Sequence, residues 1–407
     1  MNKAKAFRLL VILFVIIEML SFLRGWILIR DWIPIILFAT VFTLLYPEVL
    51  FKRETFFLFL YFGVLCLYFA LEHAIVTPRW LFSEIFIPLT CLLIINGFLI
   101  NGDHNGLKIV AIVSLTIIII NSVGTIKIVS SESDAVRNMV IYSVKGDIKT
   151  YQHYLKSGMA SFGQVHALPF LLPILIGLAK HNSVTKMKLI LLLISFFSYY
   201  FIIKTAFTTP ILLATVGMLL ALFVTTNMRL NLFLLGLFIS LYFIFANTGV
   251  LFHFLGGKKY LFTDTFVLER INDVSNSIMS GQTTGHVKVR GDLYLTSLST
   301  FLKHPLLGGF ETNSAGGHAF ILDRFAYFGL VGTVPFTVYL YYILKRVYKF
   351  IDIPLQPYFF ISIMLFITLG LSKNITGIEN YLYLFVVIPG LLLFSRQPLK
   401  SAYIADH

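Results

Sequence analysis

Charge and cysteine are both scarce in this chain of 407 residues. Only 13% of the residues are Asp, Glu, Lys or Arg, whereas 58% are hydrophobic; soluble domains average about 25% charged residues. This composition excludes an ordinary soluble enzyme. The two cysteines, Cys66 and Cys91, each lie in the middle of a long apolar stretch. We expect them to pack in the protein core and not to form a disulfide or bind a metal.

Acidic metal-binding motifs are also missing from the sequence. The segments between the apolar runs contain no DxD, no HExxH and no clustered carboxylates. Any chemistry performed by the chain is therefore expected to need neither a metal ion nor another cofactor.

Long apolar runs are what the sequence does contain. They are about 17 to 25 residues long, the length that a helix needs to cross a hydrocarbon core of about 30 Å. The first run follows a basic N-terminus but no signal-peptide cleavage site, so it is expected to span the membrane. The chain is predicted to be an all-α, polytopic membrane protein with one membrane domain over 1–407. About twelve spans are expected, at roughly 7–23, 33–46, 56–71, 81–100, 107–123, 158–178, 187–203, 209–225, 230–248, 319–344, 358–371 and 378–395.

The distribution of Lys and Arg predicts the orientation of these spans. Short loops on one side are rich in basic residues, which places that side and both termini in the cytoplasm. The opposite side holds two long connections, 124–157 and 249–318. These connections are also basic, which favours an anionic partner there, although a solvated basic surface is an equally good explanation. Their cations are Lys127, Arg137, Lys145, Lys149, Lys156, Lys258, Lys259, Arg270, Lys288, Arg290 and Lys303.

An amphipathic helix is expected within the larger outer loop, over 287–310. Its apolar residues recur at helical spacing, and the HPLLGG sequence ends it. Arg290 lies near its start and Lys303 near its end. A guanidinium can bind two phosphate oxygens at once and stays charged, as a pyrophosphate site requires. Arg270, and Lys204 in KTAFTTP, are further candidates for contacts to a phosphorylated substrate.

The segment GGHAFILDRFAYFGLVG, 316–332, places three ionisable residues at the start of a predicted span. His318 is expected at the outer mouth of the helix, where the helix dipole favours a neutral imidazole that can act as a base. Asp323 is five residues further on, about 140° around a helix, so it is not expected to share a face with His318. Asp323 is expected to pair with a cation, with Arg324 and Lys373 as candidates, and a structural role is favoured for this pair over catalysis. Asp323, Arg324 and Lys303 are also candidates for substrate contacts.

Three stretches resemble the bacterial O-antigen ligase and polymerase superfamily, especially its Wzy-type polysaccharide polymerases. They are GMASFGQVHALPFLLPIL (158–175), RGDLYLTSLSTFLKHPLLGGF (290–310) and GGHAFILDRFAYFGLVG (316–332). The last two are similar to an arginine followed by a Pro-Leu-Leu-Gly segment, and to an outer-loop histidine with a G-x-x-G at the head of a helix. With the helix count included, the resemblance covers most of the chain.

The resemblance implies a GT-C-like helical fold and a metal-independent, inverting glycan transfer from undecaprenyl pyrophosphate to an acceptor hydroxyl. By position, His318 is the base and Arg290 a pyrophosphate ligand. Relatives carry a Ser-Arg-Gly where this chain has KTAFTTP, so Lys204 is expected to replace that arginine. The implied partners are lipid-linked oligosaccharides, the bilayer and a chain-length regulator, with no nucleic acid. The implied location is the outer face of the bacterial plasma membrane.

Other functions remain open at this point. A ligase of the same superfamily would move finished polymer onto lipid A core or another acceptor. A flippase or transporter would show two similar halves with sites near the bilayer midplane, whereas the polar residues here gather on one face. A conventional GT-C glycosyltransferase would use an acidic base in the first outer loop, where Asp31 lies.

Overall fold

The computed structural model describes residues 2–26, 32–71, 78–132, 134–144, 147–224, 285–309, 315–375 and 377–395, together with Gly236. All regular structure in these residues is helical. The chain divides into two compact units. Unit 1 comprises Met1–Phe223, Val334–Leu369 and Ile375–His407, and unit 2 comprises Val224–Thr333 and Gly370–Asn374. Apart from Gly236, the predicted span 230–248 lies outside the described residues, as does Arg270.

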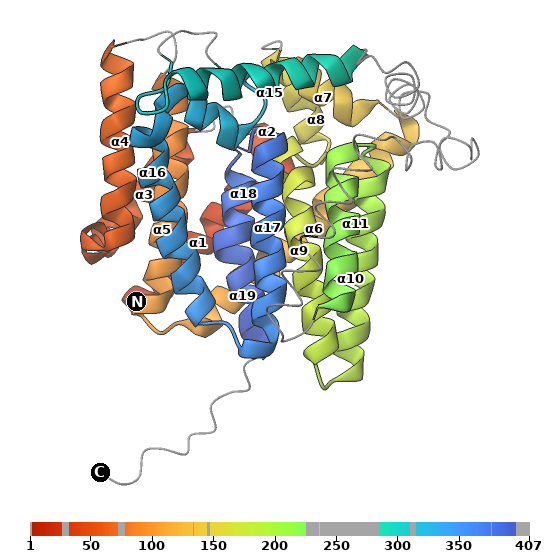
Figure 1. The fold of residues 1–407 in the computed structure, drawn as a ribbon. Coiled ribbons are helices and arrows are strands. Elements are labelled where there is room, and N and C mark those ends of the chain that lie inside the picture. The colour runs from red at the N-terminus through yellow and green to blue at the C-terminus, as the bar shows by residue number, and fades with distance from the viewer. Residues whose placement is uncertain are drawn as a thin grey trace, which may run out of the picture. The chain divides into compact units, whose positions relative to one another are not determined.

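The first part of unit 1 is a series of helices with short connections (Figure 1). Asn2 caps the first helix, because its side chain accepts the N–H of Ala4 at 3.1 Å. Leu20 then leaves the helical conformation, with ψ of 102°, and divides the first predicted span into α1 and a short α2. The elements are α1 (Lys3–Met19), α2 (Ser21–Trp26), α3 (Trp32–Leu45), η1 (Pro47–Phe51), α4 (Arg53–Leu71), α5 (Pro78–Ile100) and α6 (His104–Ser131).

The segment 124–157, expected as a loop, is largely helical. Helix α6 continues to Ser131, and the short helices α7 (Ala135–Val144) and α8 (Ile148–Lys156) follow it. Leu155 of α8 is buried in a small apolar cluster with residues of α7 and with Met159. The sequence did not reveal these helices because each is short and less apolar than the predicted spans.

Helix α9 (Phe162–His181) lies in the interior of unit 1. Every residue from Gln164 to Ala179 is buried, which a helix achieves only when its whole circumference is apolar or satisfied by neighbours. It packs against α10 (Thr185–Lys204) and α11 (Thr208–Phe223), as Figure 1 also shows. Polar groups at the start of α9 are therefore held in a fixed position.

The last helices return through unit 1. Helix α16 (Phe320–Lys349) begins in unit 2 and ends in unit 1, and η2 (Ile353–Leu355) and α17 (Gln356–Ser372) follow it. The last described segment is buried from Ile378 to Leu393, and it consists of α18 (Ile378–Leu382), the π-helical η3 (Tyr383–Val387), α19 (Ile388–Leu392) and η4 (Leu393–Ser395).

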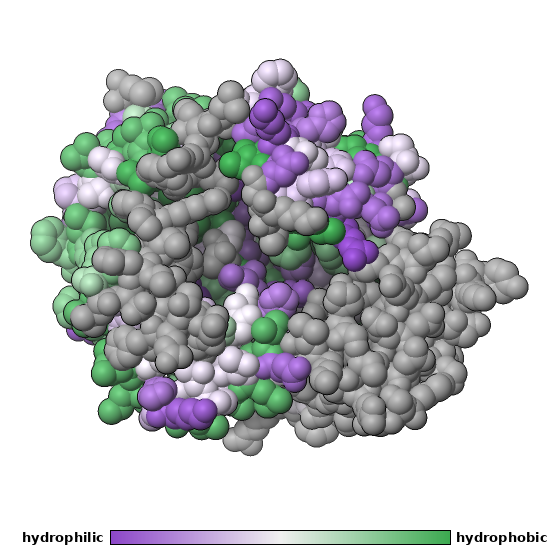
Figure 2. Space-filling view, turned by 90° about the horizontal axis from the view of Figure 1, so that it is seen from above, coloured by the Kyte–Doolittle hydropathy of each residue, from purple (hydrophilic) through white to green (hydrophobic). Residues whose placement is uncertain are grey.

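The length and apolar composition of these helices are those of a polytopic membrane protein. Among the described residues, six helices are long and apolar enough to cross a membrane, and four shorter helices of 10–17 residues are apolar as well. Figure 2 shows both hydrophilic and hydrophobic residues exposed on the face seen from above. The twelve-span count and the GT-C-like arrangement stay predictions.

Candidate functional site

Helix α15 (Gly285–Lys303) is the first element of the candidate site, and it lies in unit 2. Arg290 precedes Ser297 by seven residues, which is nearly two helical turns. The two backbone positions therefore lie on the same side of α15, about 10.5 Å apart along its axis. Lys303 is the last residue of α15 and is exposed.

Helix α16 is broken at Gly329, and the HPLLGG segment after α15 fills the break. Gly329 has φ of 54° and ψ of −154°, so the helical hydrogen-bond ladder is interrupted there. The N–H groups that begin the second half of α16 donate elsewhere: Leu330 to the carbonyl of Pro305 at 2.9 Å, and Val331 to that of Leu306 at 3.0 Å. The two motifs 290–310 and 316–332 are thus joined through their backbones.

The first half of α16 is tied to the same segment. Gly309 donates its N–H to the carbonyl of Ala326 at 2.8 Å, satisfying an acceptor that the break would leave free. A Cβ atom on Gly329 would lie 2.4 Å from the carbonyl oxygen of Leu306. Only glycine provides both the positive φ and this close approach.

Ser297 connects α15 to the loop that carries His318. Its hydroxyl donates to Oδ1 of Asp323 at 2.7 Å. The hydroxyl oxygen of Ser297 in turn accepts the N–H of Gly316 at 2.9 Å. Gly316 lies directly against α15, because a Cβ on it would be 2.4 Å from the carbonyl oxygen of Leu293. The loop is therefore held to α15 by both a hydrogen bond and close packing.

Asp323 holds the same loop from the other side. Its Oδ2 accepts the N–H of Ala319 at 2.9 Å, and the N–H of Gly317 is also hydrogen-bonded to this carboxylate. The backbone N–H groups on both sides of His318 are thereby bound to the Ser297–Asp323 pair. His318 itself is exposed and attracted electrostatically by Asp323. This interaction is possible because α16 begins at Phe320, so the helical angle expected between the two residues does not apply.

The hydrogen-bond donors described for Asp323 are not the side chains that the sequence suggested, and its pairing with Arg324 or Lys373 stays a prediction. In the described part of the chain they are a hydroxyl and backbone N–H groups. Arg324 is adjacent on the helix, and adjacent side chains point apart; it is 4% exposed, donates to the carbonyl of Phe320 at 3.1 Å and lies over the Phe320 ring. Lys373 contacts the start of α16 through its carbonyl, which accepts the N–H of Phe320 at 3.1 Å.

The other predicted residues are placed only by the elements that carry them. Lys204 is the exposed last residue of α10 in unit 1, with its ammonium 5.6 Å from the centre of the Tyr200 ring. Arg290 is placed by its backbone on α15, whereas Arg270 and Asp31 lie outside the described residues.

The sequence did not reveal a partly buried ion pair in unit 1. Arg24 of α2 donates to Oε1 of Glu379 in α18 at 2.5 Å, and the Ser161 hydroxyl donates to the same oxygen at 2.6 Å. Gly163 and Gly377 approach closely enough that a Cβ on either would lie within 2.9 Å of Oε2. The signal was present, since Glu379 is a carboxylate inside a predicted span, as Asp323 is.

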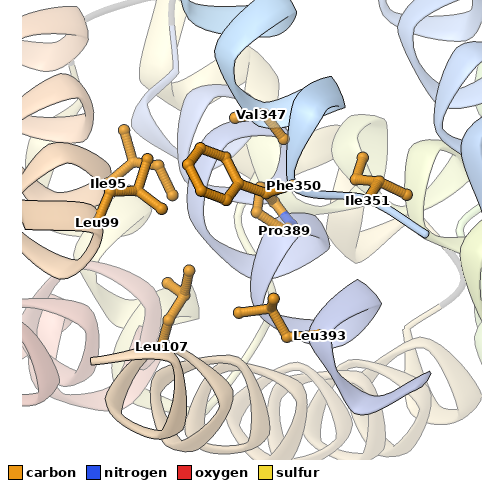
Figure 3. A pocket seen from close by; sticks show the side chains of 8 residues that line it. All are labelled: Ile95, Leu99, Leu107, Val347, Phe350, Ile351, Pro389 and Leu393. Carbon is orange, nitrogen blue, oxygen red and sulfur yellow. The ribbon is translucent and has the colours of Figure 1, made fainter. Parts of the chain in front are cut away.

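One pocket in unit 1 is unsuited to a phosphorylated or sugar ligand. Figure 3 shows side chains from α5, α6, the end of α16 with the turn after it, α19 and η4 surrounding it, and all of them are apolar. They offer no hydrogen-bonding side chain. The lining residues are Ile95, Leu99, Leu107, Val347, Phe350, Ile351, Pro389 and Leu393.

Comparison with known proteins adds no family to this description: no family model matches the chain, and no curated protein matches it. The fold defines a class, the helical polytopic membrane proteins.

Proposed function

We propose that the chain is a polysaccharide polymerase that joins oligosaccharide repeats carried on undecaprenyl pyrophosphate. The reaction takes place at the outer face of a bacterial plasma membrane, with both termini in the cytoplasm. The product is an O-antigen or capsular polymer, and the protein is a metal-independent, inverting glycosyltransferase. The support from sequence is the order and spacing of the three stretches that resemble the Wzy-type polymerases.

One structural observation carries the proposal. Ser297 lies on the same side of α15 as Arg290 and binds the loop that presents His318. A single helix therefore supports both the residue proposed to bind pyrophosphate and the residue proposed to act as base. This is the arrangement that transfer from a lipid pyrophosphate needs, because the leaving group and the attacking hydroxyl meet at the same carbon.

The proposed reaction is a single displacement. His318 accepts the proton of the acceptor sugar hydroxyl, and the oxygen attacks the anomeric carbon of the donor glycan. A glycosidic bond forms while the bond from that carbon to the phosphate oxygen breaks, with inversion. Undecaprenyl pyrophosphate leaves with the electron pair, and the charge of Arg290 stabilises it.

Product analysis with purified protein separates the polymerase from a ligase. The protein is given one substrate, undecaprenyl pyrophosphate carrying a single repeat, and released undecaprenyl pyrophosphate is measured. A polymerase releases it without any other acceptor, because a second substrate molecule supplies the hydroxyl. Release that begins only after lipid A core is added would contradict the proposal and support the ligase.

A further inference from the structure

A second polar network lies in unit 1 where α4, α5 and α16 approach one another. Arg346 of α16 forms a two-point contact with Glu54 of α4, with Nη1–Oε1 2.6 Å and Nη2–Oε2 3.2 Å. Asn96 of α5 is fully buried, and its amide oxygen accepts from Arg346 and, at 2.8 Å, from the ammonium of Lys52. Its amide nitrogen donates to Glu54 at 3.4 Å. The four side chains form one connected network.

This network carries more positive than negative charge. Lys52 and Arg346 are cations, and Glu54 is the carboxylate bonded within the network. Arg346 uses its paired N–H groups on that carboxylate, whereas Lys52 donates to a neutral amide oxygen. An ammonium has three N–H donors and one of them is used by Asn96. Lys52 is thus equipped to bind an additional anion.

The surroundings of Lys52 favour the binding of an anion to its ammonium group. Burial lowers the pKa of Lys52, and the nearby charge of Arg346 lowers it further; Glu54 and Glu48 act in the opposite direction. Glu48 is exposed, so water screens its attraction. A half-buried ammonium beside a second cation gains more from an anionic oxygen than an exposed lysine does.

The position of Lys52 indicates where the anion comes from. Lys52 directly precedes the candidate membrane span Arg53–Ala70, which places it at the level of lipid headgroups. Phe51 is 89% exposed and Phe56 is 61% exposed. Exposed aromatic side chains beside a cation at the end of a span suit acyl chains and a headgroup together. A soluble phosphate ion would gain nothing from these rings.

We propose that Lys52 and Arg346 form a binding site for the phosphate of an anionic phospholipid. The headgroup phosphate accepts from the free N–H donors of Lys52, and the lipid chains lie along Phe51 and Phe56. The site is independent of the proposed glycan transfer. A bound lipid stabilises the contact between the ends of α4, α5 and α16 in membranes that contain anionic lipid. In membranes without anionic lipid the site has no ligand.

The test uses the purified full-length protein in nanodiscs of phosphatidylcholine, with or without phosphatidylglycerol. Retained lipid is counted by native mass spectrometry, and thermal unfolding is followed in the same samples. We expect phosphatidylglycerol to bind and to raise the melting temperature, and Lys52→Gln to weaken this binding about tenfold. Arg53→Gln is the matched control, because Arg53 is the next residue and is exposed but has no place in the network; it should bind as the wild type does.

Three results would overturn the proposal. The first is equal loss of binding in Lys52→Gln and Arg53→Gln, which would indicate nonspecific attraction. The second is stabilisation by inorganic phosphate in pure phosphatidylcholine that Lys52→Gln removes, which would indicate a soluble ligand. The third needs no variant and so holds even if Lys52→Gln fails to fold: a photoreactive phosphatidylglycerol headgroup should label the wild-type chain within 47–56, and labelling confined to other segments contradicts the site.

Discussion

Ser297 and Asp323 are joined by a hydrogen bond of 2.7 Å between α15 and the first turn of α16, and together they bind the loop that carries His318. Both residues are buried, with Asp323 7% exposed, whereas His318 is exposed. An exposed residue on a rigidly held loop can act on a ligand without rearrangement of its surroundings. The pair is therefore expected to position His318 and not to react itself.

The Ser297–Asp323 bond can be tested by removing the hydroxyl. In Ser297→Ala, Asp323 loses a donor and the N–H of Gly316 loses its acceptor, at a cost of about 1–3 kcal/mol in the free energy of unfolding. Transferase activity should fall as well, because the His318 loop is no longer fixed. Thermal unfolding and turnover are measured on the same membrane preparations.

Thr296→Ala is the matched control for that variant. Thr296 is exposed, and its hydroxyl donates to the carbonyl of Asp292 in its own helix at 2.8 Å. Its loss should change neither stability nor activity appreciably. Equal behaviour of the two alanine variants would show that Ser297 does not hold the loop.

His318→Ala should nearly abolish polymer formation while leaving expression and thermal stability close to wild type. Loss of a general base costs about 10² to 10⁴ in rate, and an exposed side chain contributes little to packing. The measurement is polymer content of a deletion strain that carries the variant at matched membrane abundance. Wild-type polymer levels would rule out His318 as the base.

Two substitutions of Arg290 separate the effect of its charge from that of its two-point contact to phosphate. Arg290→Ala is expected to be nearly inactive, and Arg290→Lys to recover part of the activity, since lysine keeps the charge but loses the two-point contact to phosphate oxygens. Both variants are compared by the initial rate of undecaprenyl pyrophosphate release. Full activity of the alanine variant would show that Arg290 does not bind the pyrophosphate.

Gly329→Ala should destabilise unit 2. The substitution forces an alanine into a positive φ, which costs about 1–2 kcal/mol, and places its Cβ 2.4 Å from the carbonyl oxygen of Leu306. Gly63→Ala in α4 is the control, because nothing lies within 4 Å of the added atom. If Gly329→Ala lowers the melting temperature no more than Gly63→Ala does, the close packing of Leu306 against the helix break at Gly329 is contradicted.

Several of the expected spans coincide with long apolar helices, because a long apolar run encodes such a helix locally. The stretch expected at 187–203 is α10, Thr185–Lys204, and that expected at 358–371 is α17, Gln356–Ser372. The contacts of the candidate site were not predictable in this way. The bond from Ser297 to Asp323 crosses 26 residues, and that from Arg24 to Glu379 crosses 355.

The break at Gly329 shows a second reason why sequence alone falls short. A glycine within an apolar run is compatible with an intact helix. Only the structure shows that Leu306 approaches Gly329 closely and that α16 is broken there. The hydrogen bonds to Asp323 were not predictable for a similar reason. A buried carboxylate suggests a cation, and the sequence does not show that a hydroxyl and a backbone N–H also bind this one.

The most direct test of the proposed function is the product pattern from a single substrate. Purified protein is incubated with undecaprenyl pyrophosphate carrying one repeat, and the glycans are resolved by mass spectrometry, with His318→Ala as the blank. The proposal predicts a ladder whose members differ by one repeat, together with released undecaprenyl pyrophosphate. If the glycan lengthens only when lipid A core is present, and then in one step, the chain is not a polymerase.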